Sequence, residues 1–221
     1  IRFSKEEIHQ ILPYLKLHRI QWRYHYNPHP EEAFCILLYR LFYPYRLKNC
    51  LKIFGSSRGR LSVICNDLVS YLISRYAETL FWDKWRLTFD TLQRYVYANT
   101  IKCTSGLPGI WGFVDSTMRP FCHPGENQGS FYSGYKKCHP FKFQSIVTPD
   151  GLLSSLAGLF PGPIGDWVVW HSCGIVEILQ DIFSKSKISE EERLYVYGDS
   201  AYSPVFGVMG PFVEQVNKPL T

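Results

Sequence analysis

The spacing of hydrophobic and polar residues changes once along the chain and divides it into two parts. Over residues 4–99 apolar residues recur three or four positions apart, which is the spacing of helices that bury one face. From about residue 106 onward this pattern gives way to short apolar runs and to strict alternation, separated by turns rich in glycine and proline. The pattern predicts an α+β protein with a helical region over 1–105 and strands with helices over 106–221.

The boundaries of several helices are visible in the helical region. Ser4-Lys5-Glu6-Glu7 has the form of a capping box, which predicts a helix that starts there. Pro30 suits the first turn of a second helix that runs to about residue 43. A short helix is expected over 46–55, closed by Gly55, and a further one over 85–98.

Between these helices lies a pattern typical of a helix-turn-helix. The short helix over 46–55 is followed by a turn that contains glycine, and then by a longer helix with apolar residues from Leu61 onward. A helix-turn-helix would bring Arg58 and Arg60 close to DNA phosphates or base edges. The alternative is an ordinary helical hairpin with a solvated basic turn.

Two apolar strands in the second part are each expected to end at an aspartate. Residues 110–114 predict a strand that ends at Asp115, and residues 194–198 predict one that ends at Asp199. Between them, residues 141–147 and 152–160 predict a hairpin, and residues 167–183 a helix. Ligands of open α/β sheets bind at the carboxyl ends of strands, and two adjacent carboxylates favour a shared Mg²⁺ or Mn²⁺ ion. For each aspartate taken by itself, the alternative to metal binding is a cap of a turn or a helix.

The charge is distributed unevenly between the two parts of the chain. The net charge is +5 over 221 residues, but residues 1–105 carry 16 Lys and Arg against eight Asp and Glu, and residues 106–221 carry eight against 11. A basic part followed by an acidic part fits a polyanion-binding region joined to a cation-binding region, and chance variation of surface charge is the alternative. No apolar run is long enough to span a membrane, and no signal peptide is recognised.

The cysteines indicate a reducing compartment. Seven cysteines without regular spacing argue against a disulfide framework. Cys122-His123 and Cys138-His139 raise the question of a zinc site, but their spacing matches no common zinc motif.

Around the two aspartates the sequence resembles a known family. Gly112-Phe113-Val114-Asp115-Ser116-Thr117 is similar to the GFxDxT block of PIF/Harbinger-type transposases, which are DDE superfamily endonucleases. Further blocks follow in the family's order, in residues 128–132, 135–139, 142–145, 148–151 and 162–166, and finally in Tyr197-Gly198-Asp199-Ser200-Ala201-Tyr202, which matches its GDxxY block. The helical region also resembles the helix-turn-helix region that precedes the nuclease core in this family.

The resemblance implies an RNase H-like mixed sheet flanked by helices, with carboxylates that hold two divalent ions and cleave phosphodiester bonds. By position it implies Asp115 and Asp199 as ligands and Asp166 as a ligand or a supporting acid, with a helix cap as the alternative for Asp166. The chain has Gly165 where the family has histidine. Glu214 lies too close to Asp199 to be the family's third acid, so the expectation is a core truncated at its C-terminus and impaired in catalysis.

The resemblance further implies DNA as a partner, a possible second DNA-binding protein as another, and a nuclear location with a cytoplasmic one as the alternative. Lys136, Lys137 and Lys142 form a basic cluster that would contact phosphates or, alternatively, cover a solvated hairpin edge. Two rival functions stay open at this point. One is a non-catalytic DNA-binding or partner-recruiting protein derived from a transposase, and the other is a metal-dependent hydrolase of small phosphate esters.

Overall fold

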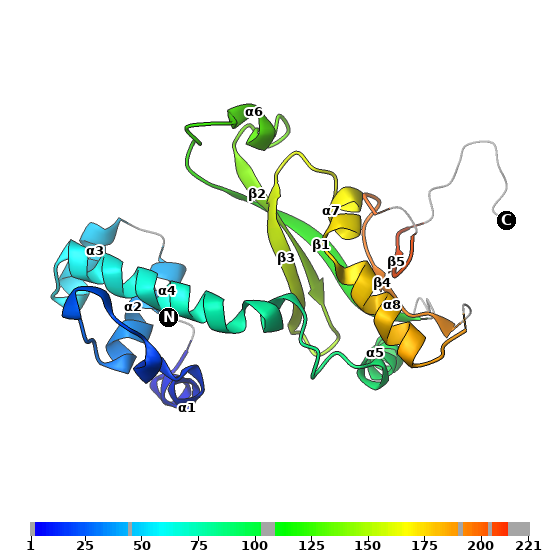
Figure 1. Cartoon of the computed structure of the whole chain (residues 1–221), viewed down its shortest axis with the longest axis horizontal. Coiled ribbons are helices and arrows are strands. Elements are labelled where there is room, and N and C mark those ends of the chain that lie inside the picture. Colours follow the sequence, from blue (N-terminus) through cyan, green and yellow to red (C-terminus); the bar gives the residue numbers. More distant parts are fainter. Residues whose placement is uncertain (1–2, 44–45, 103–108, 190–191, 203–204, 212–221) are drawn as a thin grey trace. The chain divides into compact units, whose positions relative to one another are not determined.

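A computed structural model describes residues 3–43, 46–102, 109–189, 192–202 and 205–211 (Figure 1). The chain forms two compact units, Ile1–Ala77 and Glu78–Thr221. The first unit contains 12 Lys and Arg against five Asp and Glu, and the second contains 12 against 14. The net positive charge of the chain is therefore located in the first unit. The predicted division at residue 105 into a DNA-binding region and a nuclease core stays a prediction.

The first unit is helical, as the apolar spacing predicted. Its helices are α1 (Lys5–Leu15), the short 3-10 helices η1 (Leu17–Arg19) and η2 (Arg23–His25), α2 (Pro30–Phe42), α3 (Leu47–Phe54) and the long α4 (Arg58–Phe81), which continues into the second unit. The predicted capping box is present: the Ser4 hydroxyl accepts from the Glu7 amide, and the Glu7 carboxylate accepts from the Ser4 amide. Gly55 closes α3 with a left-handed backbone conformation (φ 58°).

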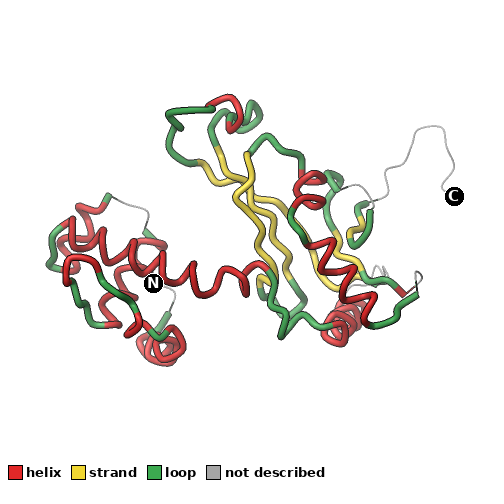
Figure 2. The backbone as a smooth tube through the Cα atoms, viewed as in Figure 1, coloured by secondary structure: helices red, strands yellow, loops and turns green. Residues whose placement is uncertain are grey.

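The second unit is built on a five-stranded mixed sheet. Its elements are α5 (Phe89–Lys102), β1 (Ile110–Pro120), α6 (Gln128–Phe131), β2 (Pro140–Val147), β3 (Leu153–Pro161), α7 (Asp166–Ser172), α8 (Ile175–Lys185), β4 (Tyr195–Tyr197) and β5 (Val208–Met209). The strands lie in the order β3-β2-β1-β4-β5 (Figure 2). Strand β2 is antiparallel to both β3 and β1, whereas β4 is parallel to both β1 and β5. The predicted α+β fold is confirmed, and the sheet with its flanking helices is consistent with an RNase H-like core.

Strand β1 is longer than the sequence predicted. The apolar run ends at Asp115, but the strand continues to Pro120. It does so because β1 pairs with β2 without interruption from Phe113↔Val147 to Pro120↔Pro140. Asp115 therefore lies within a strand, and the residues before and after it are both paired with β2.

The region over 167–183 is helical, as predicted, but it is divided into two helices. Two helices, α7 and α8, occupy this region. Gly174 separates them, because it adopts a left-handed conformation (φ 85°) that an α-helix cannot contain.

One face of the sheet is covered and the other is open within the described residues. Val114, Ile146 and Val196 lie on three neighbouring strands and are buried in a core that includes Leu179 and Phe183 of α8. Across the opposite face run Phe113, Val147 and Leu153, each at least 40% exposed. Asp115 follows Phe113 at strand spacing, so it projects on the open side. No helix among the described residues is long and apolar enough to cross a membrane.

The β2–β3 turn is fastened to α5 and to the segment before it through Asp150. The Asp150 carboxylate accepts hydrogen bonds from Thr148 Oγ1 (2.6 Å) and Tyr95 Oη (2.7 Å), and it lies 3.3 Å from an Arg86 guanidinium nitrogen. Burial raises the pKa of Asp150. The hydrogen bonds from Thr148 and Tyr95, a third from the Leu152 amide, and the positive charge of Arg86 lower it by more, so the pKa of Asp150 lies below its usual value.

This arrangement predicts an acid-dependent contribution to stability. Because the folded-state pKa of Asp150 lies below its unfolded value, the contribution is present above about pH 4 and is lost as the pH falls through the folded pKa. Asp150→Asn is therefore expected to lower the free energy of unfolding at pH 7 and to have less effect at pH 3. Urea unfolding at the two pH values measures this difference, and an equal loss at both would contradict it.

Candidate active site

Asp115 lies on β1, and Asp199 lies two residues past the end of β4, which pairs with β1 in parallel. Strands β1 and β4 pair through Gly112↔Val196 and Phe113↔Tyr197. Two residues further along each chain are Asp115 and Asp199, and neighbouring strands are about 4.8 Å apart. The parallel pairing of β1 and β4 thus directs both paired segments toward the same end of the sheet, where each is followed by one of the two aspartates.

Both carboxylates are exposed and retain free coordination capacity. Asp115 accepts a hydrogen bond from the Ser116 amide (2.7 Å), and Asp199 accepts one from the Ala201 amide (3.0 Å). Within the described residues neither forms an ion pair with a lysine, arginine or histidine. Two anionic oxygen donors without a compensating cation fit a hard divalent ion such as Mg²⁺ or Mn²⁺. The described residues contain, however, no group of three or more His, Cys, Asp or Glu that could hold a metal ion.

Tyr202 connects the two segments that carry these aspartates. Its side chain is only 2% exposed, and its hydroxyl lies 2.9 Å from the hydroxyl of Ser116, the residue after Asp115. The same hydroxyl donates to the side-chain oxygen of Gln144 on β2 (3.3 Å), and the Tyr202 amide donates to the Asp199 carbonyl (3.1 Å). Tyr202 therefore holds the loop after β4 against β1 and β2.

The electrostatic surroundings of Tyr202 favour its protonated form. Burial raises the pKa of the Tyr202 hydroxyl far above its usual range, and the charges of Asp166, Asp115 and Asp199 raise it further. The Tyr202 hydroxyl therefore keeps its proton throughout the physiological range.

Gly198 leaves the space that the Tyr202 ring needs. A Cβ atom on Gly198 would lie 2.6 Å from the ring of Tyr202, closer than real contacts allow. We expect Gly198→Ala to lower the free energy of unfolding by about 1–3 kcal/mol, the usual cost of overpacking a core. Gly134→Ala is the matched control, because a Cβ on Gly134 meets no atom within 4 Å. Thermal denaturation of both variants tests the prediction, and equal melting temperatures would contradict it.

Asp166 is the first residue of α7, and it forms an ion pair with Lys142. Lys142 Nζ lies 2.7 Å from Asp166 Oδ1 and also donates to the Ile164 carbonyl. The Lys142 residue is 4% exposed, so its charge is directed into the protein and not toward solvent. Gly165, not Asp166, is the N-cap of α7. No local sequence pattern predicts this pair, because its members lie 24 residues apart on a strand and a helix.

The other predicted basic residues differ in their surroundings. Lys136 and Lys137 are exposed in the segment between α6 and β2, where Lys136 Nζ lies 4.7 Å from the ring centre of the exposed Tyr135. Arg58 is exposed at the first residue of α4. Arg60 instead forms a bidentate pair with Glu32 of α2 (2.7 and 3.2 Å), which raises the pKa of Arg60. Arg60 thus contributes to the packing of the first unit.

The predicted Cys-His pairs do not form a metal site in the described structure. The rings of His123 and His139 lie 4.2 Å apart, and Cys122 is exposed. No set of three such ligands converges among the described residues, and the six described cysteines are free thiols.

A mixed sheet with one carboxylate on β1 and another just after its parallel neighbour β4 is consistent with an RNase H-like nuclease core. The family model described as DDE superfamily endonuclease matches residues 114–221, the segment that contains Asp115, Asp166 and Asp199. This segment is therefore a DDE superfamily endonuclease domain, as the sequence blocks indicated. Searches of curated proteins and of solved structures gave no significant match. Assignment to the Harbinger type stays a prediction.

Proposed function

We propose that this protein is a transposase-derived, Harbinger-type endonuclease that uses Mg²⁺ or Mn²⁺ to cleave phosphodiester bonds in DNA. The observation that carries the proposal is the placement of Asp115 on β1 and of Asp199 two residues past the end of β4, the parallel neighbour of β1, within a DDE superfamily endonuclease domain. Divalent ions bound there would activate a water or a 3′-hydroxyl and stabilise the leaving oxygen.

The chain's own residues supply the positions for this chemistry. Asp115 lies on β1, which pairs with β2 both before and after this residue. Tyr202 holds the loop that carries Asp199. The Tyr202 hydroxyl keeps its proton because burial raises its pKa, so it orients its neighbours and does not act as a base. Asp166 is compensated by Lys142 and acts as a supporting acid that sets the position of α7.

DNA binding is proposed for two exposed basic regions. Arg58 begins α4 in the first unit, which carries the excess of positive charge, and Lys136 and Lys137 are exposed in the second unit. Phosphate contacts of this kind give a binding constant that falls steeply with salt. Charge-neutral variants of Lys136 and Lys137 should reduce the salt slope, whereas Arg60, already paired with Glu32, is expected to contribute less. A nuclear location follows from this function.

Nicking of supercoiled plasmid DNA tests the proposal. The account predicts conversion to the open circular form with Mn²⁺ or Mg²⁺, and none with EDTA. Protein that binds DNA in low salt but leaves the plasmid intact with either metal would contradict the nuclease assignment.

A second candidate is a non-catalytic DNA-binding or partner-recruiting protein derived from such a nuclease. The observation in its favour is that the described residues contain no three-ligand metal group. It predicts DNA binding with the same affinity in EDTA and in Mn²⁺, and no nicking in either.

A further inference from the structure

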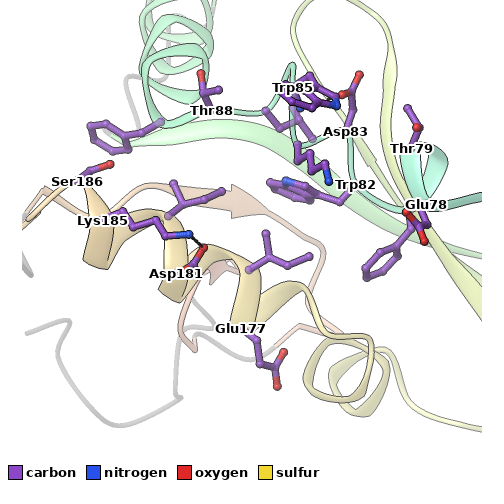
Figure 3. Close-up of a pocket in the computed structure, with 16 residues that line it drawn as sticks. Glu78, Thr79, Trp82, Asp83, Trp85, Thr88, Glu177, Asp181, Lys185 and Ser186 are labelled. Atoms are coloured by element: carbon purple, nitrogen blue, oxygen red, sulfur yellow. Dashed lines mark hydrogen bonds and ion pairs between the residues drawn. The ribbon is translucent and has the colours of Figure 1, made fainter.

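An apolar cleft with an acidic rim lies in the second unit, formed by the last turn of α4, the residues between α4 and α5, and helix α8 (Figure 3). Its volume is about 750 Å³, within the range of pockets that bind ligands. One wall contains Trp82 and Leu87, and Ile178 and Ile182 of α8 form the other. None of the residues that carry the proposed nuclease chemistry lines it.

The apolar surface of the cleft continues onto an exposed tryptophan. Trp85 is 86% exposed at the rim, although its amide is held by the Asp83 carboxylate (3.1 Å). The turn is therefore fixed, and the indole is presented to solvent with Lys84 Nζ 5.8 Å from the ring centre. Exposed tryptophans beside a cleft are the residues that most often dominate binding energy at protein interfaces.

The charges around the rim select the kind of partner. Four carboxylates line the cleft, against two lysines: Glu78, Asp83, Glu177 and Asp181 against Lys84 and Lys185. Asp181 is already paired with Lys185 (2.6 Å), and Asp83 lies near Arg86 (3.9 Å). Among the described residues no ion pair compensates Glu78 or Glu177, both of which are exposed. This rim repels nucleic acid and attracts positive charge.

We propose that this cleft binds a basic amphipathic helix of a partner protein. The partner's apolar face would lie in the groove between α8 and the turn that carries Trp85, and its lysines or arginines would meet Glu78 and Glu177. Helices that bind in this way insert apolar side chains about one turn apart into a hydrophobic groove. The proposal is independent of the nuclease function, because it uses no residue of the candidate active site.

Two labelled synthetic 15-residue peptides test the proposal by fluorescence anisotropy. One is an amphipathic helix of leucine and lysine, and the other has glutamate in place of every lysine. The Leu/Lys peptide is expected to bind at least about tenfold tighter, and less tightly as salt is added. Trp85→Ala should weaken it about 30-fold, the usual effect of removing a dominant interface residue, and Glu177→Gln should weaken it by a smaller factor.

Matched variants outside the cleft separate this site from general attraction. Trp167→Ala removes another exposed tryptophan, and Glu126→Gln removes another exposed carboxylate; neither should change the affinity. Trp85 is exposed, so its variant is expected to fold, and an unchanged melting temperature confirms this. Equal affinity for the two peptides, or unchanged binding by Trp85→Ala, would overturn the proposal. So would self-association in light scattering that Trp85→Ala abolishes, since a second copy would then occupy the cleft.

Discussion

Replacing Asp115 by asparagine is expected to lower the affinity for Mn²⁺ by at least about 100-fold and to abolish any Mn²⁺-dependent nicking. Loss of a group that merely supports a metal ligand already costs 10- to 100-fold in affinity, so loss of a ligand itself should cost no less. Asp199→Asn is expected to have the same effect, because both carboxylates would face one ion from adjacent strands. Isothermal titration with Mn²⁺ measures the affinity without any reliance on catalysis.

The control for this pair is Glu126→Gln, which removes one exposed negative charge from the segment before α6. It should leave Mn²⁺ affinity unchanged. If the control and the two aspartate variants bind Mn²⁺ equally well, the metal is held elsewhere or only by the general charge of the surface.

Replacing Lys142 by methionine is expected to lower the free energy of unfolding by about 3–5 kcal/mol. The lysine side chain is 6% exposed and the Asp166 side chain 19%, so the variant leaves a largely buried carboxylate without its cation. For a domain of this size such a loss lowers the melting temperature by about 10 °C. Thermal and urea denaturation measure the effect.

Two further variants distinguish the buried ion pair from an ion pair on the surface. Lys185→Met breaks the exposed pair with Asp181 on α8, whose side chains are 75% and 59% exposed, and should cost no more than about 0.5 kcal/mol. Adding Asp166→Leu to Lys142→Met removes the isolated charge and should restore most of the lost stability. A loss from Lys142→Met as small as that from Lys185→Met would show that solvent compensates Asp166.

Much of the fold was predictable because its signals are local. The capping box at Ser4, Pro30 at the first turn of α2 and Gly55 at the end of α3 each act within one helical turn. The extent of β1 was not predictable, because it depends on pairing between distant segments: the strand continues past its apolar run because β2 lies beside it. The helical region over 167–183 is divided by Gly174, whose left-handed conformation the apolar spacing did not reveal.

The candidate site was predictable in its acids but not in their supports. Asp115 and Asp199 could be found because each follows an apolar strand and lies in a recognisable block. The contact of Tyr202 with Ser116 joins residues 86 apart, and its role could not be read from either segment. In the sequence, Lys142 groups with Lys136 and Lys137 because all three are basic. In the structure Lys142 occupies one of the alternate, buried positions of β2 and faces the covered side of the sheet. Charge in a sequence does not reveal which lysine is buried.

The account rests on one shared divalent ion between Asp115 and Asp199, and anomalous diffraction from crystals soaked in Mn²⁺ measures this directly. The account predicts a peak at coordination distance, about 2.0–2.6 Å, from a carboxylate oxygen of each residue. A peak that touches only one of the two carboxylates, or their side chains turned to opposite faces of the sheet with no peak between them, would contradict it.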